Sequence, residues 1–325
     1  MNRRDTLLAL VCLGATPLAA TAQPAGKVAR VGWLSSIAGA GAGSDSIALD
    51  GLRSGLRERG WVEGKNLVIE APSGARAPED RAAEFVRQKV DLIVAQGGTV
   101  FGARAAAGAI PMVFGINGDP VEAGLVASLS RPGGSLTGVT ALSAELAGKR
   151  LELLKEAVPG ITRVAVVANM MHPGVQIELR ESQRAAQRLG LTLQWNLVYS
   201  VRDFDAAFEA IAREGAQALV AVPDPLINRQ AKSIADFSTK RRIPAVSGWA
   251  EFAEEGNLMS YGPNLRGFYR HMAVYADKLL KGARPADLPV EQPTTFAFVV
   301  NLKTAKTLGL TIPSPVLLRA DRVIE

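Results

Sequence analysis

Two aspartates, each followed directly by proline, are the acidic side chains best placed for chemistry. Asp119 ends the stretch IPMVFGINGD and Asp224 ends ALVAVPD, so each carboxylate follows an apolar run of strand length. Ligands of open α/β sheets bind beyond the carboxyl ends of the strands, where loops and helix N-termini present free amides. Two carboxylates there could hold a ligand or serve as the acid and base of a hydrolase or lyase. Asp before Pro is also a common turn or helix cap, and both roles can coexist.

Other polar or glycine-rich segments follow apolar runs in the same way. They face a common crevice if two sheets point their carboxyl ends at each other: Ser35, Ser36, Gly97 to Thr99, Asn117, Asn169, Ser247 and Trp249. These residues offer hydroxyl, amide and backbone N–H groups with one aromatic ring, and they include no evident nucleophile-base pair. The set favours reversible binding of a small polar or zwitterionic molecule over catalysis.

The loop after the first apolar run is rich in glycine but lacks the spacing of a nucleotide-binding loop. Residues 32–46 read GWLSSIAGAGAGSDS, and from Gly39 the order is Gly-Ala-Gly-Ala-Gly-Ser, which displaces the third glycine of GxGxxG. An acidic residue is expected about 20 residues further on, and Glu70 comes too late. The sequence therefore predicts no nucleotide cofactor. Ser35 and Ser36 are instead expected to contact a ligand.

Histidine and cysteine are too scarce for the usual hydrolytic or metal sites. The chain has two histidines, His172 and His271, and one cysteine, Cys12. There is no GxSxG motif, and the histidines are too far apart in sequence to form a local metal-binding motif. We expect His271 on the exposed face of a helix, and His172 either in the cleft or on a loop surface. No catalytic residue, metal ligand or cofactor is predicted.

Short apolar runs alternate with longer amphipathic stretches along most of the chain. The expected strands are VARVGWL, NLVIEA, VDLIVA, IPMVFGI, RVAVVAN, LTLQWNLVY, ALVAVPD and IPAVSG. The expected helices span residues 47–59, 79–89, 144–157, 176–189, 203–213 and 226–241. Apolar character throughout each strand is typical of parallel strands buried on both faces, so the pattern predicts parallel sheets covered by helices.

The number of strands exceeds one ordinary sheet, and three segments interrupt the alternation. They are LSRPGGSLTGVT, GNLMSYGPNL and ARPADLPVEQPTTFAFVV, each containing Gly or Pro. Three passages between two similar lobes predict a first lobe of residues 28–138 plus 262–290 and a second of residues 139–261 plus 291–325. Periodicity alone leaves an α/β barrel as an alternative.

The first 22 residues have the three parts of a secretory signal. Arg3 and Arg4 give a basic start, Leu7–Leu18 is apolar, and a small-x-small site ends at Ala22. We expect cleavage near Ala22 and a periplasmic protein. The paired arginines leave export by the general or the twin-arginine route open.

The charge pattern argues against nucleic acid as a partner. The net charge is +6, and the basic residues are interspersed with acids, as in GLRSGLRERG and LRESQRAAQRLG. A basic arm or patch of one sign, which nucleic-acid binding requires, is missing from the sequence.

Several long motifs together resemble one family. They are GLRERGWVEGKNLVIE, IPMVFGINGDPVEAGLVASLSRPGGSLTGVT, KRLELLKEAVPGITRVAVVAN, LMSYGPNL, LPVEQPTTFAFVVNLKTAKTLGLTIP and LLRADRVIE. They resemble the ABC transporter substrate-binding proteins of the tryptophan/tyrosine-type group over nearly all of the chain after the signal segment.

This resemblance implies a type I periplasmic binding fold, in which two Rossmann-like α/β lobes with parallel sheets are joined by three crossover strands. It implies a small ligand, such as an aromatic amino acid, trapped between the lobes of a monomer and delivered to a membrane permease and its ATPase. The ligand contacts that it implies are Ser35, Ser36, Gly98, Thr99, Asn117, Asp119, Asn169, Asp224 and Ser247. Two alternatives remain: an extracytoplasmic hydrolase or lyase using Asp119 and Asp224, and a ligand sensor for a membrane receptor.

Overall fold

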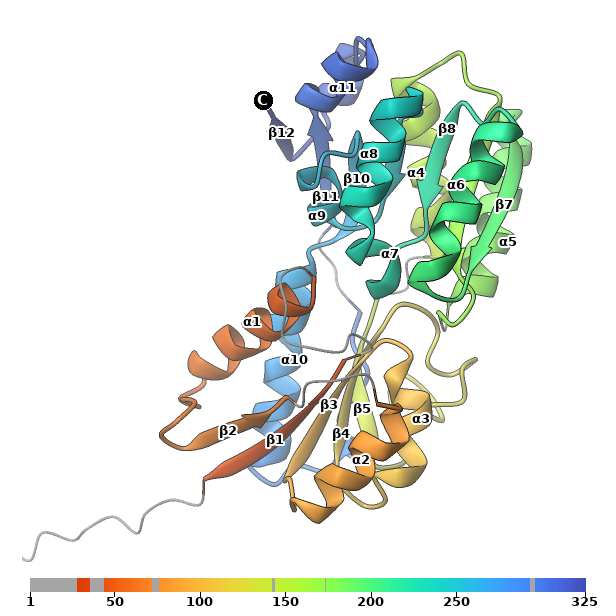
Figure 1. Ribbon diagram of the computed structural model, residues 1–325. Coiled ribbons are helices and arrows are strands. Elements are labelled where there is room, and N and C mark those ends of the chain that lie inside the picture. The colour runs from red at the N-terminus through yellow and green to blue at the C-terminus, as the bar shows by residue number, and fades with distance from the viewer. Residues whose placement is uncertain (1–27, 36–43, 72–75, 142–143, 173, 293–295) are drawn as a thin grey trace, which may run out of the picture.

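The protein forms two α/β lobes, each built on its own sheet, in the computed structural model (Figure 1). The structure describes residues 28–35, 44–71, 76–141, 144–172, 174–292 and 296–325. The expected signal segment lies outside these ranges. Two separate sheets rule out the barrel alternative and confirm the two-lobed α/β prediction.

The sheet of the first lobe has five parallel strands in the order β2-β1-β3-β4-β5. The strands are β1 (Ala29–Leu34), β2 (Leu67–Glu70), β3 (Leu92–Gln96), β4 (Met112–Ile116) and β5 (Leu136–Thr140). Helices α1 (Ser44–Arg57) and α10 (Leu265–Leu280) pack side by side on one face, and α2 (Pro78–Arg87) and α3 (Thr99–Ala106) cover the other (Figure 1). Burial of both faces explains why the strands are apolar throughout.

The sheet of the second lobe has seven strands in the order β12-β11-β10-β9-β8-β6-β7. They are β6 (Arg163–Asn169), β7 (Thr192–Val198), β8 (Ala218–Ala221), β9 (Ala245–Ser247), β10 (Met259–Pro263), β11 (Phe296–Asn301) and β12 (Arg322–Ile324). The pairs are parallel except for the antiparallel pair of β10 with β11.

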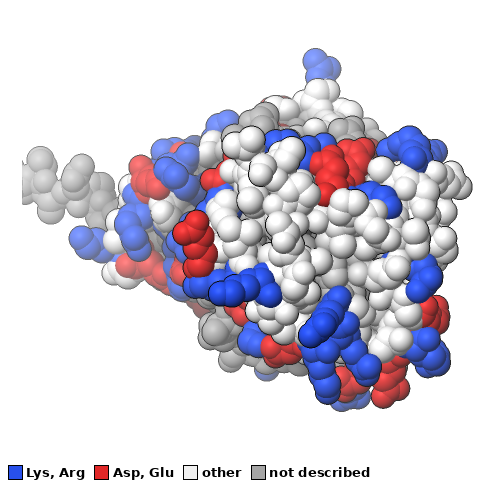
Figure 2. All heavy atoms as spheres, turned by 90° about the horizontal axis from the view of Figure 1, so that it is seen from above, with Lys and Arg blue, Asp and Glu red and all other residues white. Residues whose placement is uncertain are grey.

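Helices cover both faces of this second sheet. One face carries α4 (Ala144–Ala157), α5 (Val175–Leu189), α11 (Leu302–Leu308) and α12 (Ser314–Leu317). The other carries α6 (Phe204–Arg213), α7 (Pro225–Arg229), α8 (Ala231–Arg241) and α9 (Ala250–Glu254), with the single-turn 3-10 helix η1 (Val201–Asp203) before α6. A second such turn, η2 (Pro285–Asp287), follows α10. Acidic and basic residues are interspersed on the face seen in Figure 2.

Three chain passages connect the lobes. The chain leaves the first sheet after β5 for α4, returns after β10 into α10, and enters the second sheet again at β11. The expected lobe boundaries fall within β5, within β10 and next to Glu291, whose backbone bridges to Val139 of β5. The passages thus place the carboxyl ends of both sets of parallel strands toward each other (Figure 1).

Two local predictions were wrong. The expected helix over 226–241 is two helices, α7 and α8, because Gln230 between them leaves the helical conformation at φ −92° and ψ 7°. The segment LSRPGGSLTGVT, which was expected to interrupt the alternation of strands and helices, ends in strand β5. A Cβ at Gly138 would lie 2.0 Å from the Phe114 carbonyl oxygen of β4, so glycine serves close strand packing here.

His271 lies on α10, half-exposed as expected, and its Nε2 bonds the carboxylate of Glu291 at the third passage. Burial alone would raise the pKa of Glu291, but the bonds from His271 and Tyr275 outweigh it and lower the pKa below its usual value. The contact between His271 and Glu291 ties α10 of the first lobe to the start of the third passage, which leads to β11.

The lowered pKa of Glu291 predicts a pH-dependent contribution to stability. A depressed carboxyl pKa stabilises the fold above the unfolded value of about 4.3, and the contribution disappears as the pH falls through the folded pKa. Glu291→Gln should therefore cost about 0.5 kcal/mol at pH 6, since the pair is half-exposed, and the cost should shrink steadily as the pH is lowered below about 4. Urea unfolding of both proteins at several pH values measures this, and a difference that is constant with pH would contradict it.

Candidate functional site

A pocket lies between the lobes, beyond the carboxyl ends of the strands. Its lining comes from both lobes and from the first passage: Gly97, Gly115, Ile116, Asn117, Ala141, His172, Pro225, Trp249, Pro263, Leu265, Phe268 and Tyr269. Because both lobes contribute, a ligand here would contact the two lobes at once.

Three aromatic side chains, Trp249, Phe268 and Tyr269, form part of the wall of the pocket. Leu265, Phe268 and Tyr269 share one face of α10, as the i, i+3, i+4 spacing requires, and Trp249 precedes α9 in the other lobe. The ring of Phe268 can approach β4 because Gly115 has no side chain: a Cβ there would lie 2.8 Å from the Phe268 ring. The pocket therefore offers apolar, flat contacts suited to a ring.

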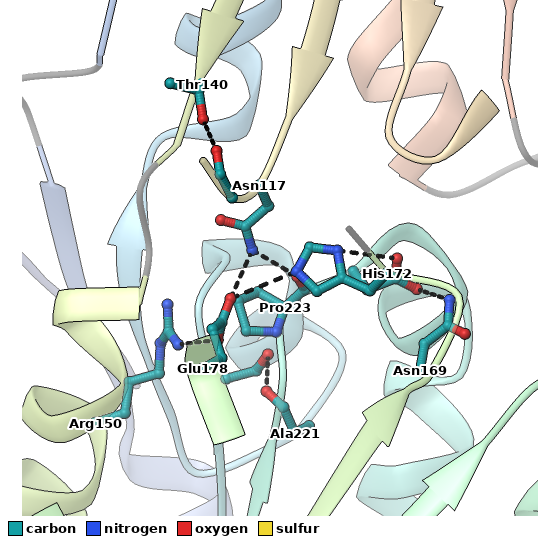
Figure 3. A network of polar contacts seen from close by, with 11 residues as sticks. Asn117, Thr140, Arg150, Asn169, His172, Glu178, Ala221 and Pro223 are labelled. Carbon is teal, nitrogen blue, oxygen red and sulfur yellow. Dashed lines mark hydrogen bonds and ion pairs between the residues drawn. The ribbon is translucent and has the colours of Figure 1, made fainter. Parts of the chain in front are cut away.

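Asn117, just past β4, is the amide side chain of the pocket. Its Nδ2 donates to Glu178 Oε1 at 3.0 Å and to the Pro223 carbonyl oxygen at 2.9 Å, both across the gap between the lobes (Figure 3). Both partners are acceptors, so the orientation of the amide is defined. Its Oδ1 is buried and has no hydrogen-bond partner among the described residues, which makes it an acceptor for a ligand donor.

His172 lies between two buried carboxylates (Figure 3). Its Nε2 is 3.6 Å from Glu178 Oε1, and its Nδ1 is 3.9 Å from Asp224 Oδ2. Asp224 is the N-cap of α7, accepting from Leu226 N at 2.8 Å, and it also accepts from Asn169 Nδ2 at 2.9 Å. The polar end of the pocket is thus backed by two negative groups.

Arg150 on α4 neutralises one of these carboxylates. Its side chain is 1% exposed, and a terminal nitrogen lies 3.1 Å from Glu178 Oε2 while Nε donates to the Tyr261 carbonyl oxygen at 3.0 Å. Burial lowers the pKa of Arg150, and the attraction of Glu178 opposes that shift. Within the described residues no Lys or Arg forms an ion pair with Asp224. The basic group beside Asp224 is instead His172, at 3.9 Å.

Several expected ligand residues form a buried layer outside the pocket lining. Ser35 donates to Gln96 Oε1 at 3.0 Å, and Thr99 donates to the Gln96 carbonyl oxygen at 2.8 Å. Ser247 donates to a carbonyl oxygen of β8 at 2.7 Å. The neighbouring Ser36 lies outside the described residues. These hydroxyls hold the strand ends that carry the pocket residues.

Gly98 and Asp119, unlike Asn117, also lie outside the pocket lining. Gly98 precedes α3, and a Cβ there would lie 3.3 Å from the Met171 carbonyl oxygen of the other lobe. Asp119 Oδ1 accepts from Val121 N at 2.7 Å and from Glu122 N at 3.2 Å, which closes a turn. Of the nine expected residues, the structure places Asn117 in the pocket lining and Asn169 and Asp224 behind His172.

The sequence carried signals for residues that were not expected at the site. Glu178 lies on the buried stripe of α5 with Val175, Ser182 and Ala185, and Arg150 lies on the buried side of α4. A charged residue in the apolar stripe of an amphipathic helix requires a buried partner. That rule would have singled out both residues, although not their pairing.

The family of the chain follows from comparison with known proteins. The sequence model described as ABC transporter substrate binding protein matches residues 41–324. The chain belongs to this family. A relative of this substrate-binding protein, the tyrosine-binding protein of Clostridioides difficile (strain R20291), is 26% identical over 271 residues, 81% of this chain and 76% of the relative.

Solved structures of two proteins have the same architecture as this substrate-binding protein. A conserved domain protein from Vibrio cholerae is 26% identical with a TM-score of 0.84, covering 91% of this chain and 100% of that chain. An ABC domain from Streptococcus pneumoniae in complex with L-Trp is 24% identical with a TM-score of 0.82, covering 91% and 99%. These likenesses confirm the type I periplasmic binding fold.

Membership of the family has general consequences for this substrate-binding protein. Proteins of this kind bind a small molecule, have a membrane transporter as partner, are usually extracytoplasmic and are not enzymes. In the described part of the chain, every helix is too short or too polar to cross a bilayer.

Proposed function

We propose that this substrate-binding protein is exported to the periplasm, traps an aromatic amino acid between its lobes and delivers it to an ABC permease and its ATPase. The observation that carries the proposal is the interlobe pocket, which has aromatic walls at one end and Asn117 and His172, backed by carboxylates, at the other. Relatives are named for tyrosine binding or solved with L-Trp, which supports the same class of ligand.

The aromatic walls account for the ring of the ligand. Trp249, Phe268 and Tyr269 all line the pocket, so a ring placed among them exchanges water for apolar contact on several sides. Aromatic pairs contribute about 0.5–1.5 kcal/mol beyond the burial of area. The pocket therefore favours a ring over an aliphatic side chain of similar volume.

The carboxylates account for the ammonium group of the ligand. The free Oδ1 of Asn117 accepts a hydrogen bond from the ammonium, and the Asp224 and Glu178 carboxyl groups behind His172 favour a cation at this end of the pocket. A nearby opposite charge favours the charged form of a ligand amine. The proposed ligand therefore binds with its ammonium toward Asn117 and its ring toward α10.

Ligand titration of the purified chain from residue 23 onward tests the proposal. L-Trp, L-Tyr and L-Phe should raise the Tm, because at 100 times the Kd a ligand stabilises the bound state by about 2.7 kcal/mol. L-Leu serves as the aliphatic control, tryptamine lacks the carboxylate, and indole-3-propionate lacks the ammonium. Stabilisation by the acid but not by the amino acids would contradict the assignment of the ammonium end.

Two Asp-Pro sites provide matched variants for the same titration. Asp224→Asn should weaken binding of the aromatic amino acid about tenfold, because Asn can still cap α7 but carries no charge. Asp119→Asn alters the same dipeptide in a turn outside the pocket lining and should leave the Kd unchanged. Equal Kd values for both variants would remove Asp224 from the site.

We further propose that the protein is a monomer that binds its ligand without converting it, and that its signal segment is cleaved near Ala22. Its two lobes would comprise residues 28–138 plus 262–290 and residues 139–261 plus 291–325. Mass spectrometry of the ligand recovered after incubation should return it unchanged; a product would favour a hydrolase or lyase. N-terminal sequencing of exported protein checks the cleavage site. Import of labelled ligand that requires both this protein and a permease would distinguish delivery from sensing for a receptor.

A further inference from the structure

The two lobes contact each other beside the pocket as well as through the three passages. Residues 97–98 and 117–118 of the first lobe meet Met171, Gly174, Glu178, Pro223 and Pro225 of the second, and we call this contact the interlobe seam. Gly98 approaches Met171, and Gly97 approaches Pro225. Since none of these contacts is covalent, opening of the lobes would separate them.

Glu178 is the charged group of the seam, and its two oxygens have different partners. Oε2 faces Arg150 of its own lobe at 3.1 Å, and Oε1 accepts from Asn117 of the other lobe at 3.0 Å (Figure 3). The side chain is 2% exposed. Arg150, itself tied to the Tyr261 carbonyl oxygen, therefore holds the carboxylate in place to receive Asn117.

Gly174 allows the approach that this bond requires. It lies just before α5, and a Cβ built on it would be 2.5 Å from the Asn117 carbonyl oxygen and 2.9 Å from Gly118 Cα. Its φ of −91° is open to any residue, so the lack of a side chain matters for space and not for backbone conformation. The start of α5 thus rests directly on the backbone after β4.

We propose that the Glu178–Asn117 bond, positioned by Arg150 and permitted by Gly174, is a latch that raises the fraction of closed molecules. Glu178 and Gly174 are outside the pocket lining, so they act on ligand affinity through closure. The apparent Kd equals the Kd of the closed form divided by the closed fraction, so loss of the latch weakens binding without changing a ligand contact. This inference rests on the proposed trapping of a ligand between the lobes.

Small-angle X-ray scattering without ligand tests the latch independently of what the pocket binds. Glu178→Gln and Gly174→Ala should both increase the radius of gyration relative to the natural protein. Glu181→Gln, one turn along α5 with its carboxylate paired to Arg184, and Gly160→Ala, with open space around it, should not. Gly174→Ala leaves the Arg150 ion pair intact, so it tests the seam even if Glu178→Gln folds poorly.

Titration with L-Trp and L-Tyr gives the second readout. Both latch variants should bind about tenfold more weakly with a faster dissociation rate, because the open form is more populated. If neither compound binds the natural protein, the aromatic-ligand proposal fails while the scattering result still decides the latch. The latch would be overturned if each latch variant had the same radius of gyration as its control. The two comparisons are Gly174→Ala with Gly160→Ala and Glu178→Gln with Glu181→Gln.

Discussion

Replacing Arg150 with methionine is expected to lower the free energy of unfolding by about 3–5 kcal/mol. Methionine has a similar length and no charge, so the packing volume changes little while Glu178 keeps a buried carboxylate without its cation. Removing one partner of a buried ion pair costs more than removing both, because the charge that remains is neither hydrated nor paired. Urea unfolding at pH 7 measures the loss.

The double variant Arg150→Met with Glu178→Gln decides whether the loss arises from the charge. It should recover most of the lost stability, since the remaining amide is neutral and, with Arg150 gone, its single oxygen is free to accept from Asn117. Lys149→Met is the matched control: Lys149 precedes Arg150 on α4, is half-exposed and pairs with Glu152, so it should cost less than about 1 kcal/mol. Equal losses for Arg150→Met and Lys149→Met would contradict the buried-charge account.

Much of the fold could be predicted because burial controls the strands directly. Runs such as RVAVVAN coincide with β6, and the helix expected over 144–157 matches α4, since both depend on which faces are covered. The pocket is different, because it depends on which residues of one lobe oppose those of the other. Asn117 could be expected near a ligand from its place after β4, but its bond to Glu178 joins segments 61 residues apart.

Glycine shows why the passages between the lobes were harder to predict. In PGGSLTG, Gly133 has φ +81°, which suits a turn, whereas Gly138 belongs to strand β5. Gly262 in β10 repeats the situation, with a built Cβ 2.1 Å from the Gly248 carbonyl oxygen. Glycine at a turn and glycine at a close backbone contact look the same in a sequence.

Gly138→Ala is therefore expected to destabilise the protein by about 4 kcal/mol or more, the range of severe steric conflicts. The added Cβ would lie 2.0 Å from the Phe114 carbonyl oxygen, and Phe114 is the residue that pairs with Gly138 across β4 and β5. The strands must separate or shift to relieve the clash, which loses ladder hydrogen bonds in the strand that leads to the second lobe.

Gly134→Ala is the control for this prediction, four residues earlier in the same segment. No atom lies within 4 Å of a Cβ built there and its φ is outside the left-handed region, so its free energy of unfolding should change by less than about 0.5 kcal/mol. Urea unfolding compares the two variants. Because β5 ends where the chain crosses to α4, Gly138→Ala should also change the scattering profile of the folded protein, whereas Gly134→Ala should not. Equal stability of the two variants would show that β5 can move away from β4 at little cost.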